Sequence, residues 1–158
     1  NREKQEKSMI YVLLAAAVFL LDFAIKSYVD KKYARKVRHP KLNGTIVIEK
    51  YYNKGAVLNF LEKSPGVMQA LHTAVMAVAG GLAVLLSKCR GKKLCKTGLA
   101  MLFGGGLSNL YDRYTKGHVV DYFHINIGPK WLRNIIFNVS DFFIFIGVIL
   151  AAVGSEKE

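Results

Sequence analysis

Residues 9–29, MIYVLLAAAVFLLDFAIKSYV, form an apolar block that contains only two charged side chains, Asp22 and Lys26. An α-helix needs ~20 apolar residues to cross the hydrocarbon core of a bilayer. A cleaved signal peptide is the alternative, but the two charges interrupt the block and no small-x-small cleavage site follows it. We therefore expect a retained transmembrane helix over residues 9–29.

Three more apolar blocks follow along the chain, over about residues 67–86, 97–111 and 135–153. The block at 97–111 includes three consecutive glycines, which allow helices to approach closely in lipid. The pattern predicts a mainly α, integral membrane fold with four transmembrane helices, in a single membrane domain over residues 1–158.

The polar segments between these blocks contain strand-like sequence. TIVIEKYYN, at 45–53, is rich in β-branched and aromatic residues, and so is HVVDYFHINI at 118–127. We expect a small extracytoplasmic β and loop region over about residues 30–66, which ends where Pro65 and Gly66 precede the next helix.

The composition favours a membrane surface as the partner of the charged residues. The 158 residues are 52% hydrophobic and 22% charged, with a net charge of +12, and much of the Lys and Arg flanks the apolar blocks. Basic flanks of this kind contact anionic lipid headgroups. Nucleic acid is not expected, because no pattern offers a basic groove with stacking aromatics.

Four crossings would place both termini on one side of the membrane. The short linker after the second helix is basic and so predicts a cytoplasmic linker and cytoplasmic termini; its cations are Lys88, Arg90, Lys92, Lys93 and Lys96. The flank after the first helix is also basic, which leaves the opposite orientation open. Cys89 and Cys95 lie in the linker and are interpreted as incidental thiols on the reducing, cytoplasmic side of the membrane.

No metal or cofactor is expected. The four histidines, His39, His72, His118 and His124, show no metal-ligand spacing. The chain has no GxSxG elbow, no HExxH motif and no P-loop, and no histidine suits Ser108 or Ser140 as the partner of a serine nucleophile.

Aspartates at the edges of the apolar blocks are the candidate catalytic groups. Asp121 lies in an apolar strand-like context. Asp141 follows Asn138 by three residues, so Asn138 and Asp141 would share a helix face. Two carboxylates in a poorly hydrated site share a proton, and such a pair can hydrolyse a peptide bond without metal. Sequence alone does not show that Asp121 and Asp141 meet.

Other polar residues have both structural and functional interpretations. Asp22 and Lys26 are one helical turn apart and can pair. Asn109, Asp112 and Arg113 would share one helix face. Asp112 and Arg113 could form a structural pair, and Arg113 could instead hold a phosphate or a substrate carbonyl.

Four motifs in order resemble those of the lipoprotein signal peptidase (signal peptidase II) family. That family carries Asn-x-Gly-Ala, Gly-Asn-x-x-Asp-Arg, Gly-x-Val-Val-Asp-Phe and Phe-Asn-x-Ala-Asp, and a first-helix pattern Asp-Gln-x-x-x-Lys. The matching stretches here are NKGA at 53–56, SNLYDR at 108–113, GHVVDY at 117–122 and FNVSD at 137–141, with Asp22 and Lys26 in the first apolar block. Each motif alone is weak, but the ordered set is specific.

The resemblance implies an aspartyl endopeptidase of the bacterial cytoplasmic membrane, acting as a monomer without a cofactor. Its substrate would be a prolipoprotein, cleaved on the amino side of a diacylglyceryl-modified cysteine. The resemblance implies a catalytic dyad of Asp121 and Asp141. Residues that would surround the dyad or hold substrate are Asn53, Gly55, Asn109, Arg113 and Asn138, and supporting polar residues are Asp22, Lys26 and Asp112.

Five positions depart from the family pattern: Phe23, Val57, Leu58, Ser108 and Ser140. They bear on substrate preference more than on chemistry, because the aspartates and asparagines are retained. Two other functions remain open at this point. One is a non-catalytic or altered-specificity paralogue that binds lipopeptides, and the other is a small transporter with a proton relay, for which we see no inverted repeat.

Overall fold

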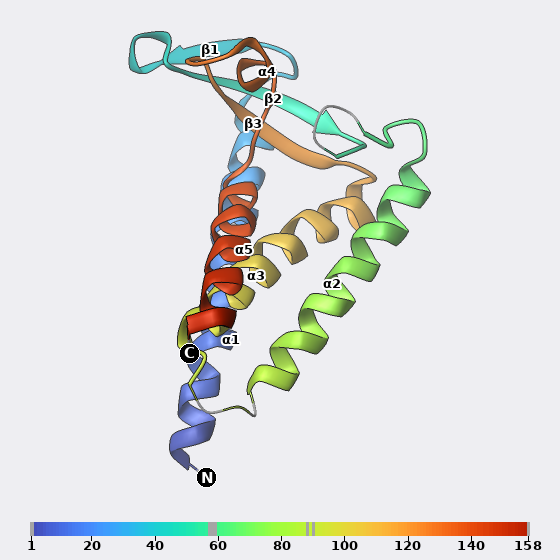
Figure 1. Cartoon of the computed structure of the whole chain (residues 1–158). Coiled ribbons are helices and arrows are strands. Elements are labelled where there is room, and N and C mark those ends of the chain that lie inside the picture. The colour runs from blue at the N-terminus through green and yellow to red at the C-terminus, as the bar shows by residue number, and fades with distance from the viewer. Residues whose placement is uncertain (1, 57–59, 88, 90, 158) are drawn as a thin grey trace. The chain divides into compact units, whose positions relative to one another are not determined.

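The computed structural model describes residues 2–56, 60–87, 89 and 91–157, with side chains described within 8–155. Val57, Leu58, Lys88 and Arg90 lie outside the described residues. The elements in order are α1 (Arg2–Lys32), β1 (Arg38–Lys41), η1 (Leu42–Gly44), β2 (Ile46–Asn53), α2 (Pro65–Ser87), α3 (Lys93–Lys116), β3 (Val119–Ile125), α4 (Lys130–Arg133) and α5 (Val139–Lys157) (Figure 1).

The four expected helices are present, and three of them differ from the expected bounds. α1 and α3 extend beyond their apolar blocks into basic flanks, which remain helical because nothing in those flanks breaks a helix. α5 begins at Val139 and not at 135, so this part of the prediction was wrong. The reason is that Phe137 pairs with Phe123, whose carbonyl accepts the Phe137 N–H at 2.8 Å. Asn138 therefore precedes α5 and does not share a helix face with Asp141.

The sheet has three antiparallel strands in the order β1-β2-β3. β2 and β3 confirm the two strand-like stretches, and their register pairs Tyr51 with Asp121 beyond an irregularity between Ile48 and Tyr51. β1 was not expected, because its four residues, RHPK, show no alternation of polar and apolar side chains. Its Pro40 is tolerated because β1 is an edge strand of the sheet. The sheet thus joins the segment before α2 to the segment after α3.

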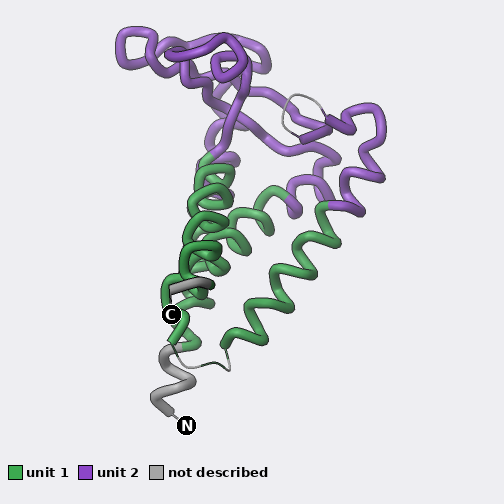
Figure 2. Tube along the Cα trace, in the orientation of Figure 1, with its two compact units in different colours: residues 1–22, 72–109, 139–158 green, residues 23–71, 110–138 purple. Residues whose placement is uncertain are grey.

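The chain divides into two compact units, each made of segments that are distant in the sequence (Figure 2). Unit 1 contains residues 1–22, 72–109 and 139–158, which supply helical segments. Unit 2 contains residues 23–71 and 110–138, which supply the sheet, α4 and the remaining helical segments. Each unit is described by itself below.

In unit 1, glycines bring α3 against three other helices. A Cβ at Gly98 would lie 2.5 Å from the Gly147 carbonyl oxygen of α5, and one at Gly105 would lie 2.9 Å from the Ser140 carbonyl oxygen. Gly104 meets the backbone of α1 at Ala15 in the same way, and Gly106 meets Met76 of α2. The expected role of the glycine run is confirmed, since contacts this short leave no space for a side chain.

Two helices are long and apolar enough to cross a bilayer within the described part of the chain, Ser8–Lys32 of α1 and Pro65–Ser87 of α2. Only 11% of the most apolar window of each helix is buried, so most of its apolar side chains face outward, as in helices that contact lipid. The apolar part of α5, Val139–Ser155, is shorter than the ~20 residues of a full span. α3 has charged residues in both terminal turns. Two of the four expected crossings therefore have the length and composition of a full span.

Replacing Gly98 with alanine should destabilise the protein by about 1–3 kcal/mol, because the new methyl group overlaps the backbone of α5. Gly81→Ala is the matched control: a Cβ there meets nothing within 4 Å, and alanine favours helix by about 1 kcal/mol over glycine. Thermal unfolding of both variants in detergent measures the difference. Equal midpoints for the two variants would show that α3 and α5 do not pack this closely.

Candidate active site

Both carboxylate oxygens of Asp121 accept hydrogen bonds from asparagine amides. Asp121 lies on β3 and is 3% exposed. Asn53 Nδ2, at the end of β2, donates to Oδ2 at 2.9 Å, and Asn138 Nδ2, just before α5, donates to Oδ1 at 2.7 Å. Asn138 is fully buried, so this amide has a fixed environment. The two amides hold the carboxylate in one orientation.

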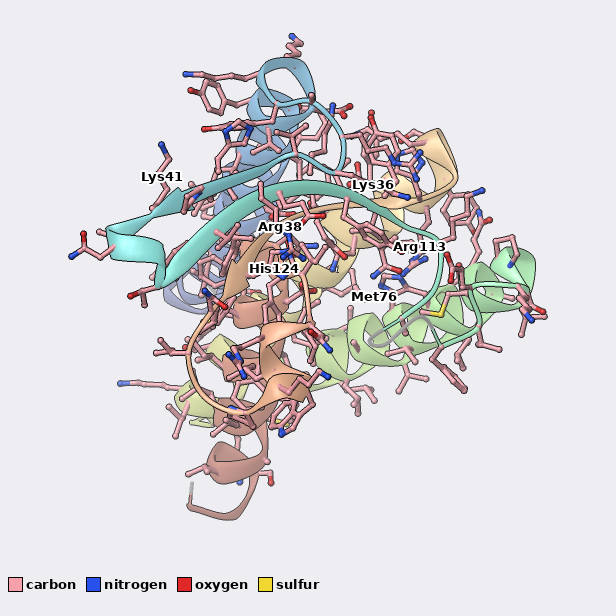
Figure 3. The ribbon with its side chains drawn as sticks, turned by 90° about the horizontal axis from the view of Figure 1, so that it is seen from above. Lys36, Arg38, Lys41, Met76, Arg113 and His124 are labelled. Atoms are coloured by element: carbon pink, nitrogen blue, oxygen red, sulfur yellow. The ribbon has the colours of Figure 1, made fainter. Side chains whose placement is uncertain are left out.

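The turn after β2 is held by its own side chain and by α3. Asn53 Oδ1 accepts the Gly55 backbone N–H at 3.0 Å, which orients the Asn53 amide toward Asp121. Arg113 donates from Nη1 to the Lys54 carbonyl at 3.2 Å and from Nη2 to the Gly55 carbonyl at 2.5 Å. Arg113, labelled in Figure 3, is 9% exposed, and its guanidinium holds main-chain carbonyls of this protein.

Asp112 joins three elements within unit 2. Its Oδ2 lies 3.5 Å from the Lys26 ammonium of α1 and accepts the Val120 backbone N–H of β3 at 3.1 Å. Its Oδ1 pairs with Lys116, one turn further along α3, at 2.9 Å. Lys26 and Asp112 are each 1% exposed. Because Val120 precedes Asp121, the hydrogen bond from the Val120 N–H to Asp112 fixes the start of the strand that carries Asp121.

Asp141 and Asn109 lie together in unit 1. Asn109 Nδ2 of α3 donates to Asp141 Oδ1 at 3.2 Å. Asp141 is in the first turn of α5, where the positive end of the helix dipole favours a carboxylate. The amide-to-carboxylate arrangement is thus the same chemical motif as at Asp121.

Asp22 accepts two hydrogen bonds from serines. It is fully buried in unit 1, where the Ser108 hydroxyl donates to Oδ2 at 2.6 Å and the Ser140 backbone N–H donates to Oδ1 at 3.2 Å. In unit 2, Lys26 forms an ion pair with Asp112. Ser108, one of the departures from the family pattern, therefore has a structural task as a donor to Asp22.

A second polar cluster in unit 2, centred on the buried pair Glu49 and His124, was missed by sequence reasoning. His124 Nε2 lies 2.9 Å from Glu49 Oε2, His124 Nδ1 lies 3.2 Å from the Arg133 carbonyl oxygen, and Arg38 Nε donates to Glu49 at 2.8 Å (Figure 3). Burial raises the pKa of the Glu49 carboxyl, but the hydrogen bonds and charges of Arg38 and His124 outweigh burial and hold the pKa below its ordinary value. His124 and Glu49 are 75 positions apart, so only strand pairing brings them together.

The predicted site residues thus fall into two sets. Asn53, Gly55, Arg113, Asn138 and Asp121 are brought together in unit 2. Asn109 and Asp141 are brought together in unit 1, so the two aspartates belong to different units. Within the described residues, no three His, Cys, Asp or Glu side chains form a group that could hold a metal ion.

The distribution of polar and apolar residues defines the class of protein. Several of the largest fully buried side chains are charged or polar, including Lys26, Asn138, Asp22 and Asp112, while apolar side chains of α1, α2 and α5 are exposed. Charged side chains inside apolar helical proteins face the interior and mark functional sites. The fold and site are those of a membrane protein with a polar, carboxylate-containing interior.

The family described as signal peptidase (SPase) II matches residues 14–155 of this chain, which therefore belongs to that family. A lipoprotein signal peptidase of Chromobacterium violaceum is 32% identical over 146 residues, which cover 92% of this chain and 90% of that protein. A lipoprotein signal peptidase of Geobacillus thermodenitrificans is 30% identical, and the match covers 91% of this chain and 88% of that protein.

Solved structures share the fold. One structure of a bacterial membrane enzyme superposes with a TM-score of 0.79 at 23% identity, over 94% of this chain and 88% of that chain. A second gives a TM-score of 0.76 at 24% identity, over 94% of each chain. The mainly helical architecture with a small sheet is therefore shared with membrane enzymes.

Replacing Lys26 with methionine should destabilise the protein by about 3–5 kcal/mol, because Asp112 then loses one buried cation. Lys32→Met is the control, since it removes an exposed lysine from the same helix. Unfolding midpoints in detergent compare the two. A Lys26→Met variant as stable as Lys32→Met would mean that the buried pair does not hold α1 to α3.

Proposed function

We propose that this chain is an aspartyl endopeptidase that removes the signal peptide from prolipoproteins, on the amino side of the diacylglyceryl-modified cysteine. Membership of the signal peptidase II family supports prolipoprotein cleavage. The aspartyl mechanism and the residue roles rest on the side-chain contacts within each unit. Asp121 and Asp141 are proposed as the catalytic pair.

The observation that carries the proposal is the pair of asparagine amides that donate to Asp121, one of which, Asn138, is fully buried. Asp112, by comparison, pairs with the Lys26 ammonium. Asp121 accepts from Asn53 and Asn138, whose uncharged amides orient its carboxylate. Asp141 has an amide partner of the same kind in Asn109. Neutral donors leave a carboxylate able to exchange a proton during reaction.

The proposed reaction needs one ionised and one protonated carboxylate. The ionised aspartate takes a proton from water, whose oxygen attacks the carbonyl carbon of the scissile peptide bond. The protonated aspartate gives its proton to the carbonyl oxygen. When the tetrahedral intermediate collapses, the C–N bond breaks, the leaving amine receives the proton taken from water, and the other aspartate recovers its proton from a hydroxyl group of the intermediate. The net reaction adds one water across the peptide bond and requires no covalent intermediate.

Arg113 and the turn at 53–55 are proposed as positioning residues. Arg113 holds the carbonyls of Lys54 and Gly55, and Asn53 bonds both the Gly55 N–H and Asp121. A change at Arg113 would therefore reach Asp121 through the turn and Asn53. Such indirect support of a catalytic group matters because small displacements from the productive geometry lower the rate strongly.

We also propose four membrane crossings by α1, α2, α3 and α5, with both termini cytoplasmic and the chain acting as a monomer. α1 and α2 supply two helices of spanning length. Basic residues gather where α2 connects to α3, with Lys92 in the linker and Lys93 and Lys96 at the start of α3, and they favour a cytoplasmic linker by the positive-inside rule. The sheet would then lie on the outer side, where lipid-modified substrates are found.

Asp121→Asn and Asp141→Asn should each abolish cleavage of a diacylglyceryl-modified prolipoprotein in liposomes, while unfolding midpoints remain near wild type. Asparagine keeps the shape of aspartate but cannot exchange its proton. Asp30→Asn is the matched control, because Asp30 binds Lys50 and Tyr52 and has no proposed part in the reaction. Product is measured by a gel shift of the cleaved protein.

The same assay with an unlipidated prolipoprotein tests the substrate. Acyl burial contributes about 0.8 kcal/mol per CH₂, so a protease that uses it discriminates strongly against a substrate with an unmodified cysteine.

Either aspartate variant turning over at the wild-type rate would remove that residue from the catalytic pair. Equal cleavage of lipidated and bare substrates would instead identify a general intramembrane protease.

The orientation is tested on the thiols. Cys89 is exposed and Cys95 is buried, so a membrane-impermeant thiol reagent should label Cys89 only after the cytoplasmic membrane is opened. An Asn43→Cys variant, altered on the exposed turn between β1 and β2, should react in intact cells whose outer barrier is permeabilised. The reverse pattern, with Cys89 labelled from outside and no additional labelling in the Asn43→Cys variant, would invert the proposed topology.

A further inference from the structure

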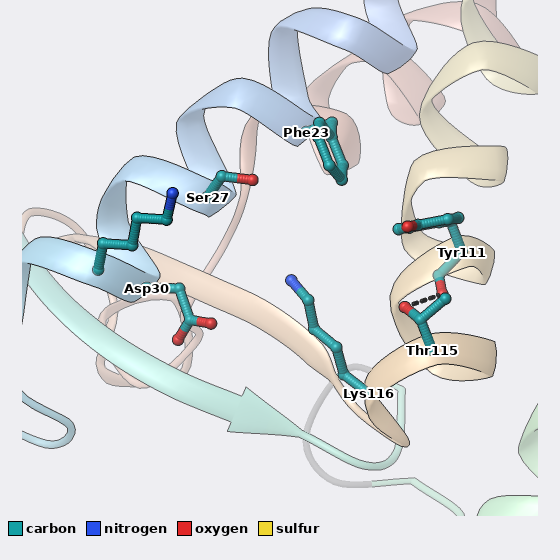
Figure 4. A pocket seen from close by; sticks show the side chains of 7 residues that line it. Phe23, Ser27, Asp30, Tyr111, Thr115 and Lys116 are labelled. Carbon is teal, nitrogen blue, oxygen red and sulfur yellow. Dashed lines mark hydrogen bonds between the residues drawn. The ribbon is translucent and has the colours of Figure 1, made fainter.

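Unit 2 contains a pocket of about 270 Å³ between the last turns of α1 and the last turns of α3 (Figure 4). Its lining is Phe23, Ser27, Asp30 and Lys31 of α1 and Tyr111, Thr115 and Lys116 of α3. None of the proposed catalytic or positioning residues lines it. Figure 4 shows the Lys116 side chain extending from α3 into the space between the two helices. The pocket is thus a separate feature of the molecule.

The charges around the pocket leave cations in excess. Both nearby carboxylates already have a buried lysine: Asp30 has Lys50 at 3.4 Å, and Asp112 has Lys26 at 3.5 Å. Asp30 also accepts the Tyr52 hydroxyl at 2.7 Å. Two more lysines, Lys31 and Lys116, line the pocket itself. Four lysines against two aspartates give this group a net charge of +2, which favours an anionic ligand.

The two lining lysines have donors to offer. Lys116 is 27% exposed, and its ammonium can keep one N–H on Asp112 while the other two point elsewhere. Lys31 is exposed and makes no ion pair with any residue that the structure describes. The Ser27 hydroxyl adds a neutral donor at the same wall. Donors of this number and charge suit the oxygens of a phosphate group.

The rest of the pocket is apolar. The rings of Phe23 and Tyr111 meet edge to face, with centroids 5.6 Å apart. A small inorganic anion gains nothing from these rings, whereas the glycerol and first methylenes of a lipid can pack against them.

The position along α1 agrees with a lipid ligand. The pocket lies in the final turns of the apolar helix Ser8–Lys32, whose last turn carries Lys31 and Lys32. Exposed tyrosines, Tyr28, Tyr111 and Tyr114, lie in the same stretches of α1 and α3. Basic and aromatic residues together at the end of an apolar helix mark the headgroup level of a bilayer.

We propose that this pocket binds the phosphodiester headgroup of an anionic phospholipid, with Lys31, Lys116 and Ser27 as donors and the Phe23 and Tyr111 rings against the glycerol. The bound lipid joins the ends of α1 and α3 beside Asp112, which holds the start of β3. It is a membrane lipid and not the substrate, whose diacylglyceryl group carries no phosphate. The proposal therefore does not depend on the peptidase assignment.

The test measures lipid binding to the purified full chain in detergent by native mass spectrometry. Phosphatidylglycerol is compared with diacylglycerol of the same acyl chains, and excess inorganic phosphate is added as a competitor. Wild type should retain phosphatidylglycerol, bind diacylglycerol much more weakly and resist displacement by phosphate. Lys31→Gln with Lys116→Gln should weaken phosphatidylglycerol binding about 30-fold, since each lysine near the surface contributes roughly 1 kcal/mol.

Two further variants separate this pocket from general attraction and from misfolding. Ser27→Phe fills the pocket without changing charge and should weaken binding by a similar factor. Lys41→Gln with Lys130→Gln removes two exposed lysines outside the pocket and should leave binding unchanged. Unchanged affinity in Ser27→Phe, equal loss in the Lys41 and Lys130 variant, equal binding of diacylglycerol, or full displacement by inorganic phosphate would each overturn the proposal.

Discussion

The buried carboxylate of Asp112 is the constraint on which the site in unit 2 depends. A single aspartate receives the Lys26 ammonium, the Lys116 ammonium and the Val120 backbone N–H, and so ties α1, α3 and β3 together. Its desolvation is costly, and only this full set of donors offsets that cost. Because Val120 is the neighbour of Asp121, its hydrogen bond to Asp112 also fixes the position of the backbone that carries the proposed catalytic carboxylate.

The polar interior has a consequence for how the helices associate. In lipid, apolar side chains give no preference for the protein interior, so packing and buried hydrogen bonds decide which faces meet. In unit 1 that role falls to the glycines of α3 and α5 and to Asp22 with its Ser108 and Ser140 donors. Glycine brings the backbones close enough for a short serine side chain to reach a carboxylate on another helix.

The two proposed catalytic aspartates share one kind of donor. Asp121 and Asp141 each accept hydrogen bonds from asparagine amides, whereas Asp112 pairs with the ammonium groups of Lys26 and Lys116. An amide orients a carboxylate without adding a positive charge beside it, and an oriented carboxylate can take and release a proton. Asp22 shows that neutral donors also serve structure, since it accepts from the Ser108 hydroxyl and the Ser140 backbone N–H.

The sequence by itself determined the four helices and the two longer strands and nominated the candidate site residues, because apolar block length, β-branched runs and motifs can be read directly along the chain. It placed Asn138 on a helix, whereas pairing of Phe137 with Phe123 leaves Asn138 before α5, where its amide reaches Asp121. Only the tertiary structure paired Asn53 with Asp121 across 68 residues and Glu49 with His124 across 75. Strand register and helix contacts decide such partners, and neither is encoded in the spacing of residues along the chain.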